Sequence, residues 1–479
     1  MKEHTVTSRW LALIVLCTGM LMIVLDATVV NVALPSIQRD LGFSQSSLAW
    51  VVNVYLIPFG GLLLLAGRLG DLIGRKRIFL IGLTVFTLAS LLCGVASSQA
   101  MLIIARLIQG VGGAMTSTVI LGVIVTMFPE LREQAKAIGI FSFVAAAGGS
   151  IGLLAGGILT QAVNWHWIFF INLPIGIIAA VLALRLVEPD RGIGLGEGAD
   201  VVGGFLVTTA LMLGVYTIVG TTDYGWGSVR TLSLGSLAIM LLVGFFVRQA
   251  TAANPLLPLR IFRSRNVVGA NLIQILMVAG MFGLFFLGAL YLQRVLGYDP
   301  MQIGLAFLPA AIAIGFFSVD ISARLNGRFG ARTVLLTGLT LMALGLALFA
   351  RVPLNAGYLI DILPSTLLIG VGVGVSFPAL MMLGMSGATS HDSGLVSGLV
   401  NTTQQIGGAL GLAVLATLST SRTAFLLAGG QSTASALTGG YHLAFSISAG
   451  LVVTAIVIAA TVLKSEATDT SEPAIEEAA

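Results

Sequence analysis

Long apolar segments alternate with short polar connections along nearly the whole chain. Each segment approaches the roughly 20 residues that a helix needs to cross the hydrocarbon core of a bilayer. The two segments near 201–220 and 400–420 are rich in Gly and Thr and give the weakest signal. The pattern predicts an all-α integral membrane protein with fourteen transmembrane helices, at 11–33, 48–67, 78–97, 101–125, 137–160, 167–186, 201–220, 232–250, 268–292, 302–322, 333–351, 357–386, 400–420 and 441–463.

The polar connections carry their positive charge unevenly. If the N-terminus is placed inside the cell, eighteen Lys and Arg residues fall in the tails and inner connections, and five fall in the outer connections. Basic residues accumulate on the cytoplasmic side of membrane proteins. The count therefore predicts a multi-pass protein with both termini in the cytoplasm, which requires an even number of spans.

Two parts of the chain repeat each other at an offset of 255 to 260 residues. Segment 37–43 returns as 292–298, the basic loop 67–77 as 323–332, and the triplet 110–112 as 370–372. Transporters are commonly built from such repeats, with the substrate site at the midplane between them. We expect a six-helix half at 1–186, a linker with two extra helices at 187–265, a second six-helix half at 266–463, and a disordered acidic tail at 464–479.

Composition excludes several classes of protein. Charged residues make up 9% of the chain and hydrophobic residues 57%, with a mean hydropathy of +1.02, whereas soluble domains carry about 25% charged residues. The net charge of +4 comes from residues between the spans and forms no stripe for nucleic acid. The two cysteines lie in apolar segments and predict neither disulfides nor a metal site. We find no phosphate-binding loop, metal-ligand spacing or catalytic triad, so we expect no cofactor and no enzyme activity.

One carboxylate stands in the first apolar segment, where an ionisable side chain is costly and is by default a functional hypothesis. Asp26 lies about sixteen residues into a span that runs outward, and Arg106 about five residues into one that runs inward, so both fall at similar depth. They can form an ion pair that either carries protons or only orders the helices. At the repeat offset their counterparts are Met281 and Thr366, so the repeated scaffold does not require the charges.

Four motifs in order carry a family resemblance: 25–35 in the first span, 67–77 between spans two and three, 106–114 in the fourth span, and 167–176 in the sixth. With them the chain resembles the major facilitator superfamily, in particular its fourteen-span drug:proton antiporters of the QacA/EmrB type. The resemblance implies the major facilitator fold, two six-helix bundles plus two extra central helices. It also implies a cytoplasmic gate, opened and closed during alternating access, formed by Gly67, Asp71, Gly74 and Arg75.

The fifth span departs from the family pattern. Leu153 stands where the family carries a proline, so the helix should be straighter and the direction of transport is less strongly implied. Gly148, Gly152 and Gly156 remain on one ridge at four-residue spacing, which allows close helix packing.

Polar, aromatic and methionine side chains within the spans are candidates for an adaptable substrate-binding wall, although each could equally pack helix against helix. We select Asn31, Tyr55, Gln109, Phe141, Met277, Met281 and Phe285.

The sequence as a whole predicts a proton-coupled secondary active exporter of hydrophobic or cationic drugs, with Asp26 as proton carrier, in a bacterial inner or plasma membrane. Its partners would be these small molecules, protons and the lipid bilayer, without nucleic acid, and we expect a monomer. Two alternatives remain open: a narrow exporter of one metabolite or antibiotic, and a membrane-embedded sensor without flux.

Overall fold

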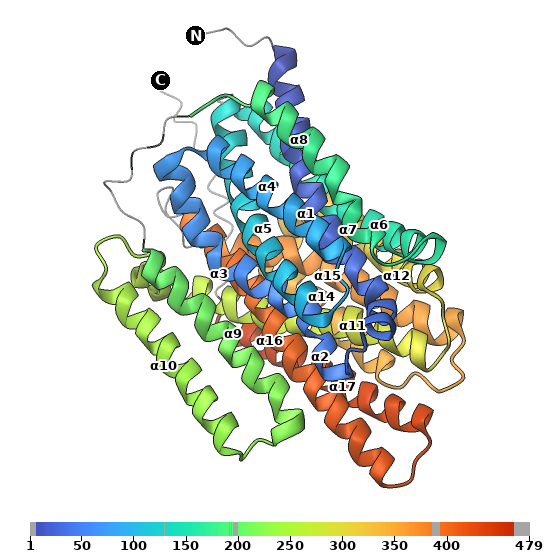
Figure 1. Cartoon of the computed structure of the whole chain (residues 1–479). Helices are drawn as coiled ribbons and strands as arrows, with labels where there is room; N and C mark the ends of the chain where they lie inside the picture. The colour runs from blue at the N-terminus through green and yellow to red at the C-terminus, as the bar shows by residue number, and fades with distance from the viewer. Residues whose placement is uncertain are drawn as a thin grey trace, which may run out of the picture.

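The computed structural model describes residues 6–128, 130–190, 192, 194, 200–385 and 393–463. Those residues form helices and connecting loops and no strands (Figure 1). The α-helices are α1 (Val6–Leu41), α2 (Gln45–Leu48), α3 (Trp50–Ile73), α4 (Arg75–Gly94), α5 (Gln99–Met127), α6 (Leu131–Ala162), α7 (Trp167–Phe170), α8 (Asn172–Leu186), α9 (Val201–Tyr224), α10 (Val229–Thr251), α11 (Arg265–Arg294), α12 (Pro300–Phe316), α13 (Ser322–Phe329), α14 (Ala331–Phe349), α15 (Leu363–Met385), α16 (Ser393–Ala428) and α17 (Thr433–Thr461). Short helices of other types lie at η2 (Leu259–Arg263), η3 (Phe317–Ile321) and η4 (Tyr358–Ile362).

The predicted apolar segments coincide with these helices, and the all-α membrane architecture is confirmed. In the described part of the chain, eleven helices are long and apolar enough to cross a bilayer, and α3 makes a twelfth if its two pieces, which meet at 51°, count as one span. The α12 helix is apolar but shorter. The number fourteen therefore stays a prediction. The acidic tail 464–479 lies outside the described residues.

The bend in α3 lies at the break between its two pieces, Trp50–Leu63 and Leu65–Ile73. Gly60 and Gly61 lie in the turn before this break, and glycine lowers the cost of bending a helix. Pro58 acts further back, because the carbonyl that its ring crowds lies four residues earlier in the chain. The fifth predicted span carries no proline, and α6 runs as one helix through position 153.

The internal repeat reappears in the backbone. Gly42 and Gly297, which are equivalent in the repeat, both adopt the left-handed conformation with φ of 69° and 73°. Gly74 and Gly330 form a second such pair, with φ of 109° and 78°. A residue with a side chain rarely adopts these angles, so glycine is required where each helix ends and the chain turns.

A close helix crossing repeats as well. A Cβ atom at Gly82 in α4 would lie 2.7 Å from the backbone nitrogen of Thr116 in α5. At the equivalent Gly338 in α14, a Cβ atom would lie 2.7 Å from the carbonyl oxygen of Gly372 in α15. Small residues allow this approach between membrane helices. We call α1–α8 the N-terminal bundle and α11–α17 the C-terminal bundle.

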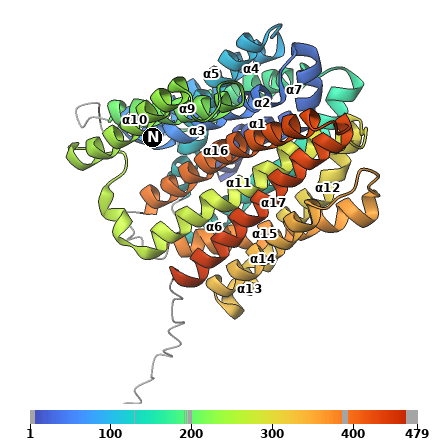
Figure 2. The same ribbon diagram turned by 90° about the horizontal axis from the view of Figure 1, so that it is seen from below.

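Helices α9 and α10 lie at the side of the molecule, with α9 next to α3 and α16 and α10 packed on α9 (Figures 1 and 2). The α9 helix touches both bundles. Thr208 packs against Gly61 of α3, and the Thr417 hydroxyl of α16 donates a hydrogen bond of 3.4 Å to the carbonyl of Ile218. The inserted pair thus covers the line along which α3 and α16 meet.

Candidate functional site: a buried carboxylate and guanidinium in the N-terminal bundle

Asp26 and Arg106 meet in the interior of the N-terminal bundle. Asp26 lies near the middle of α1 and Arg106 on the third turn of α5, and the side chains are 0% and 1% exposed. Arg106 Nη1 donates a hydrogen bond to Asp26 Oδ2. The structure therefore brings together the two charges that sequence depth placed at the same level of the membrane.

Two amides complete the shell of the carboxylate. Gln109 Nε2 donates to Asp26 Oδ1 over 2.8 Å, and Asn172 Nδ2 donates to the same oxygen over 3.3 Å. Both amides also contact Ser90 Oγ on α4, at 2.8 and 3.3 Å. Four helices, α1, α4, α5 and α8, thus contribute to one polar cluster, which we define as Asp26, Ser90, Arg106, Gln109 and Asn172.

The guanidinium is equally well surrounded. Arg106 Nε donates to the carbonyl of Val51 over 3.0 Å, and Nη1 also donates to Gln109 Oε1 over 2.7 Å. The Tyr55 ring lies over the guanidinium, 4.2 Å from its carbon to the ring centroid, a cation–π arrangement. A buried ion pair is costly unless further hydrogen bonds satisfy its remaining donors and acceptors. This cluster meets that condition.

The ion pair holds only while α1 and α5 keep this relative position. Movement of Arg106 away from Asp26 would leave an uncompensated buried carboxylate, which is costly. The cluster therefore links the charges that it contains to the arrangement of the two helices.

Sequence reasoning missed two members of this cluster. Ser90 and Asn172 received no role, although Asn172 lies in the sixth-span motif. Asn172 could have been found from its side-chain amide, which is a polar group within an apolar segment. Gln109 was selected as a substrate-binding residue, and the structure places it against the carboxylate instead.

The other substrate-binding candidates lie in different surroundings. Met277 is fully buried within helix packing, and the Phe285 ring contacts Phe307 at 5.4 Å between centroids. Met281 and Phe141 are partly buried. Asn31 Oδ1 and Tyr55 Oη are buried without a hydrogen-bond partner, so both could bind a polar group of a ligand.

The glycine ridge of α6 packs on α1. A Cβ atom at Gly148 would lie 3.1 Å from Leu21 and Val24 side-chain atoms, one at Gly152 would collide with the Thr28 hydroxyl, and one at Gly156 would lie 2.8 Å from the Val29 carbonyl oxygen. This ridge seats α6 directly beside the helix that carries Asp26.

The basic loop between α3 and α4 is held by a network of its own. Asp71 Oδ1 accepts from Arg75 Nη2 over 3.0 Å, and Arg75 Nη1 donates to the carbonyl of Gly122 over 3.0 Å. Gly74 turns the chain with φ of 109°, and a Cβ atom at Gly67 would lie 2.9 Å from Thr118.

Asp190, in the segment after α8, contacts this loop and was missed by sequence reasoning. Its carboxylate accepts from the backbone nitrogens of Arg75 and Lys76, over 2.6 and 3.1 Å. These are the first free N–H groups of α4, where a negative charge is favoured. The contacts described here for Asp71 and Arg75 lie within the N-terminal bundle and the segment after it, so a latch between the bundles stays a prediction.

Residues 16–412 match the family profile described as the Major Facilitator Superfamily. The chain belongs to this superfamily. It is 39% identical over 457 residues to the puromycin resistance protein pur8 of Streptomyces alboniger, covering 94% of this chain and 90% of that one. It is 38% identical over 424 residues to the cephamycin export protein CmcT of Amycolatopsis lactamdurans, covering 88% and 87%.

Solved structures agree on the fold of this superfamily member. A bacterial homologue of the human lysosomal transporter Spinster, in an inward-facing and unoccupied conformation, aligns with a TM-score of 0.69 over 97% of this chain and 100% of that one. Because only 16% of residues are identical, this likeness speaks for the fold alone. The family points to a membrane transporter.

Proposed function

We propose that this protein is a proton-coupled exporter of hydrophobic, cationic small molecules, of the fourteen-span QacA/EmrB type. The observation that carries the proposal is the buried cluster around Asp26. A proton-driven secondary transporter needs an ionisable group that can be shielded from water and can bind and release a proton. In the described N-terminal bundle, Asp26 is the buried carboxylate within a span that has such a partner.

Export is supported by the relatives. Two of them are named for puromycin resistance and cephamycin export. The proposed cycle begins with Asp26 accepting a proton from outside as Arg106 moves away. Drug binding from the cytoplasmic side then favours release of the proton inward, and the bundles rock about a central site that includes Asn31 and Tyr55.

Contacts between the bundles support alternating access. At the predicted outer end, Arg294 of α11 donates a hydrogen bond to Gln38 Oε1 of α1, which joins the repeat-related segments 37–43 and 292–298. A Cβ atom at Gly157 of α6 would lie 2.9 Å from the Pro300 carbonyl oxygen of α12. This arrangement fits a state closed at that end.

The topology is part of the proposal. We propose that α6 and α12 complete fourteen spans, that both termini lie in the cytoplasm of a bacterial cell, and that residues 187–265 form an insert between two six-helix halves. A monomer contains every residue of the polar cluster and would suffice for transport.

The test is transport by purified protein in liposomes with an imposed pH gradient. Wild-type protein should accumulate ethidium or tetraphenylphosphonium against its concentration gradient, and Asp26→Asn should reduce accumulation to that of protein-free liposomes. Asp223→Asn, which removes an equal charge at an exposed position of α9, is the control. Full pH-driven accumulation by Asp26→Asn would exclude the proton-carrier role.

A narrower exporter is the second candidate, because the relatives include proteins named for single compounds, such as the tetracenomycin C resistance and export protein of Streptomyces glaucescens. The same liposomes separate the two. Transport of several unrelated cations favours the multidrug function, whereas transport of one compound from a broad panel favours the narrow one. Absence of flux for every compound would leave a sensor without transport.

A further inference from the structure

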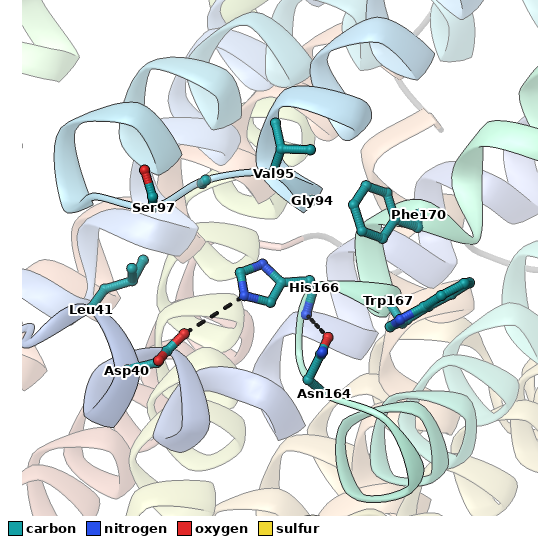
Figure 3. Close-up of a pocket in the computed structure, with 10 residues that line it drawn as sticks. Asp40, Leu41, Gly94, Val95, Ser97, Asn164, His166, Trp167 and Phe170 are labelled. Atoms are coloured by element: carbon teal, nitrogen blue, oxygen red, sulfur yellow. Dashed lines mark hydrogen bonds and ion pairs between the residues drawn. The ribbon is translucent and has the colours of Figure 1, made fainter.

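A cavity opens at the predicted outer end of the N-terminal bundle, away from the polar cluster. It has a volume of about 470 Å³ and lies between the end of α1, the turn from α4 to α5, and the turn from α6 into α7. Figure 3 shows Asp40 and His166 on one side, with Val95, Ser97 and Phe170 opposite. Its size is within the range of small-molecule pockets.

The cavity wall combines one carboxylate with aromatic rings. Asp40 Oδ2 accepts a hydrogen bond of 2.8 Å from Trp165 Nε1, and His166 Nε2 lies 3.7 Å from the same oxygen. The His166 ring stacks on the Trp165 indole at 3.7 Å between centroids. The rings of Trp167 and Phe170, which meet edge to face, line the cavity further along.

Asp40 is the main charged group at this cavity. Asp40 and His166 are the titratable side chains among the lining residues. The α4–α5 turn contributes none, and the next charge along α5 is Arg106, which is bound to Asp26. Arg39, the neighbour of Asp40 on α1, faces a different cavity that it shares with Arg294.

We propose that this cavity binds an organic cation, with Asp40 as its counter-ion and the rings of His166, Trp167 and Phe170 as its apolar wall. Aromatic faces and a carboxylate together suit a substituted ammonium or phosphonium ion. A divalent metal fits poorly, because it needs six or more oxygen ligands or a set of His and acidic ligands, and the described residues contain no group of three such side chains that could hold one.

This inference deepens the proposed function, since it gives an exported cation a contact at the outer end, but its test is binding alone. Full-length protein in lipid nanodiscs carries Trp10→Phe, Trp50→Phe and Trp226→Phe, so that indole emission reports on Trp165 and Trp167. Tetraphenylphosphonium should give a saturable signal at about pH 8.

Two variants and a control decide the result. Asp40→Asn keeps an acceptor for the Trp165 indole and should weaken binding at about pH 8 by about fivefold or more. His166→Gln removes one ring of the proposed wall and should weaken binding as well. Asp299→Asn removes the same charge at the same end of the molecule and keeps the cap of α12, so its binding should match the wild type.

Wild-type affinity in Asp40→Asn would overturn the proposal. The experiment applies no gradient and measures no flux. Failure of pH-driven export would leave a positive binding result standing, and failure of binding would leave the role of Asp26 untouched.

Discussion

The two bundles cross their helices at equivalent glycines but fill the space beside these crossings differently. Gly82 and Gly338 bring α4 onto α5 and α14 onto α15 in the same way. Beside the first crossing lies the polar cluster around Asp26. At the positions equivalent to Asp26, Ser90, Arg106 and Gln109 in the C-terminal bundle stand Met281, Leu346, Thr366 and Ile369, of which the last three are fully buried.

This difference separates the residues that the fold requires from those that it does not require. Close crossings need glycine in both bundles, because a Cβ atom would meet backbone atoms. At these four positions the C-terminal bundle has apolar side chains and a threonine that bonds to its own helix, so the charged cluster is not a condition of the architecture. A buried ion pair is costly where an apolar core would serve. The absence of its charges from the equivalent positions supports a role in transport.

The largest expected effect comes from removing one charge. Arg106→Met should lower the free energy of unfolding by about 3–5 kcal/mol, because Asp26 stays behind as an uncompensated buried carboxylate. The equivalent Thr366→Val in α15 loses only the hydroxyl that donates 3.1 Å to the Ile362 carbonyl of its own helix, and should cost about 1 kcal/mol or less. Unfolding of both variants in the same detergent measures the difference.

The double variant Asp26→Asn/Arg106→Met sharpens this test. Without the carboxylate, loss of the guanidinium leaves no buried charge, so the double variant should be more stable than Arg106→Met alone. Equal losses in Arg106→Met and Thr366→Val would contradict the contrast between the bundles.

The part of this contrast that could be predicted from sequence is the part that depends on counting along helices. Segment lengths and the rise per residue placed Asp26 and Arg106 at one depth, and the repeat offset identified their apolar counterparts. Asn172 and Asp190 were not predicted, because each reaches its partner across 146 and 115 residues of chain. Such contacts depend on which faces of two helices meet, and neither spacing nor composition determines that for a single sequence.

An intermediate effect is expected from the feature that both bundles share. Gly82→Ala and Gly338→Ala each place a Cβ atom 2.7 Å from backbone atoms of the partner helix, and should cost about 1–3 kcal/mol of stability. Gly244→Ala in α10, where a Cβ atom meets nothing within 4 Å, should be neutral or stabilising. Thermal unfolding of the three variants compares them. A large loss in only one of Gly82→Ala and Gly338→Ala would show that the crossings are not equivalent.

The smallest effect is expected outside both bundles, at the base of the inserted pair. Asp200 caps α9 and accepts from Gly203 N over 2.9 Å, Arg248 Nε over 3.0 Å and Gln249 Nε2 over 2.7 Å. Burial disfavours its charge, but the hydrogen bonds from Gly203, Gln249 and Arg248, together with the Arg248 charge, outweigh burial and lower its pKa. The carboxylate therefore stabilises the folded state above the usual aspartate pKa of about 3.9, and this contribution is lost as pH falls through the lowered value.

Asp200→Asn tests the sign of this linkage. At neutral pH the variant should be less stable than the wild type by about 1 kcal/mol, because an amide replaces a charged hydrogen-bond acceptor. The loss is no larger because the Arg248 side chain is exposed, so solvent screens its ion pair with Asp200. At about pH 3 the two should converge, since the wild-type carboxyl is then being neutralised. Circular dichroism melts in detergent measure both. A gap between wild type and variant that widens in acid would mean that Asp200 is held neutral at pH 7, and that its hydrogen bonds join α9 to α10 without the help of its charge.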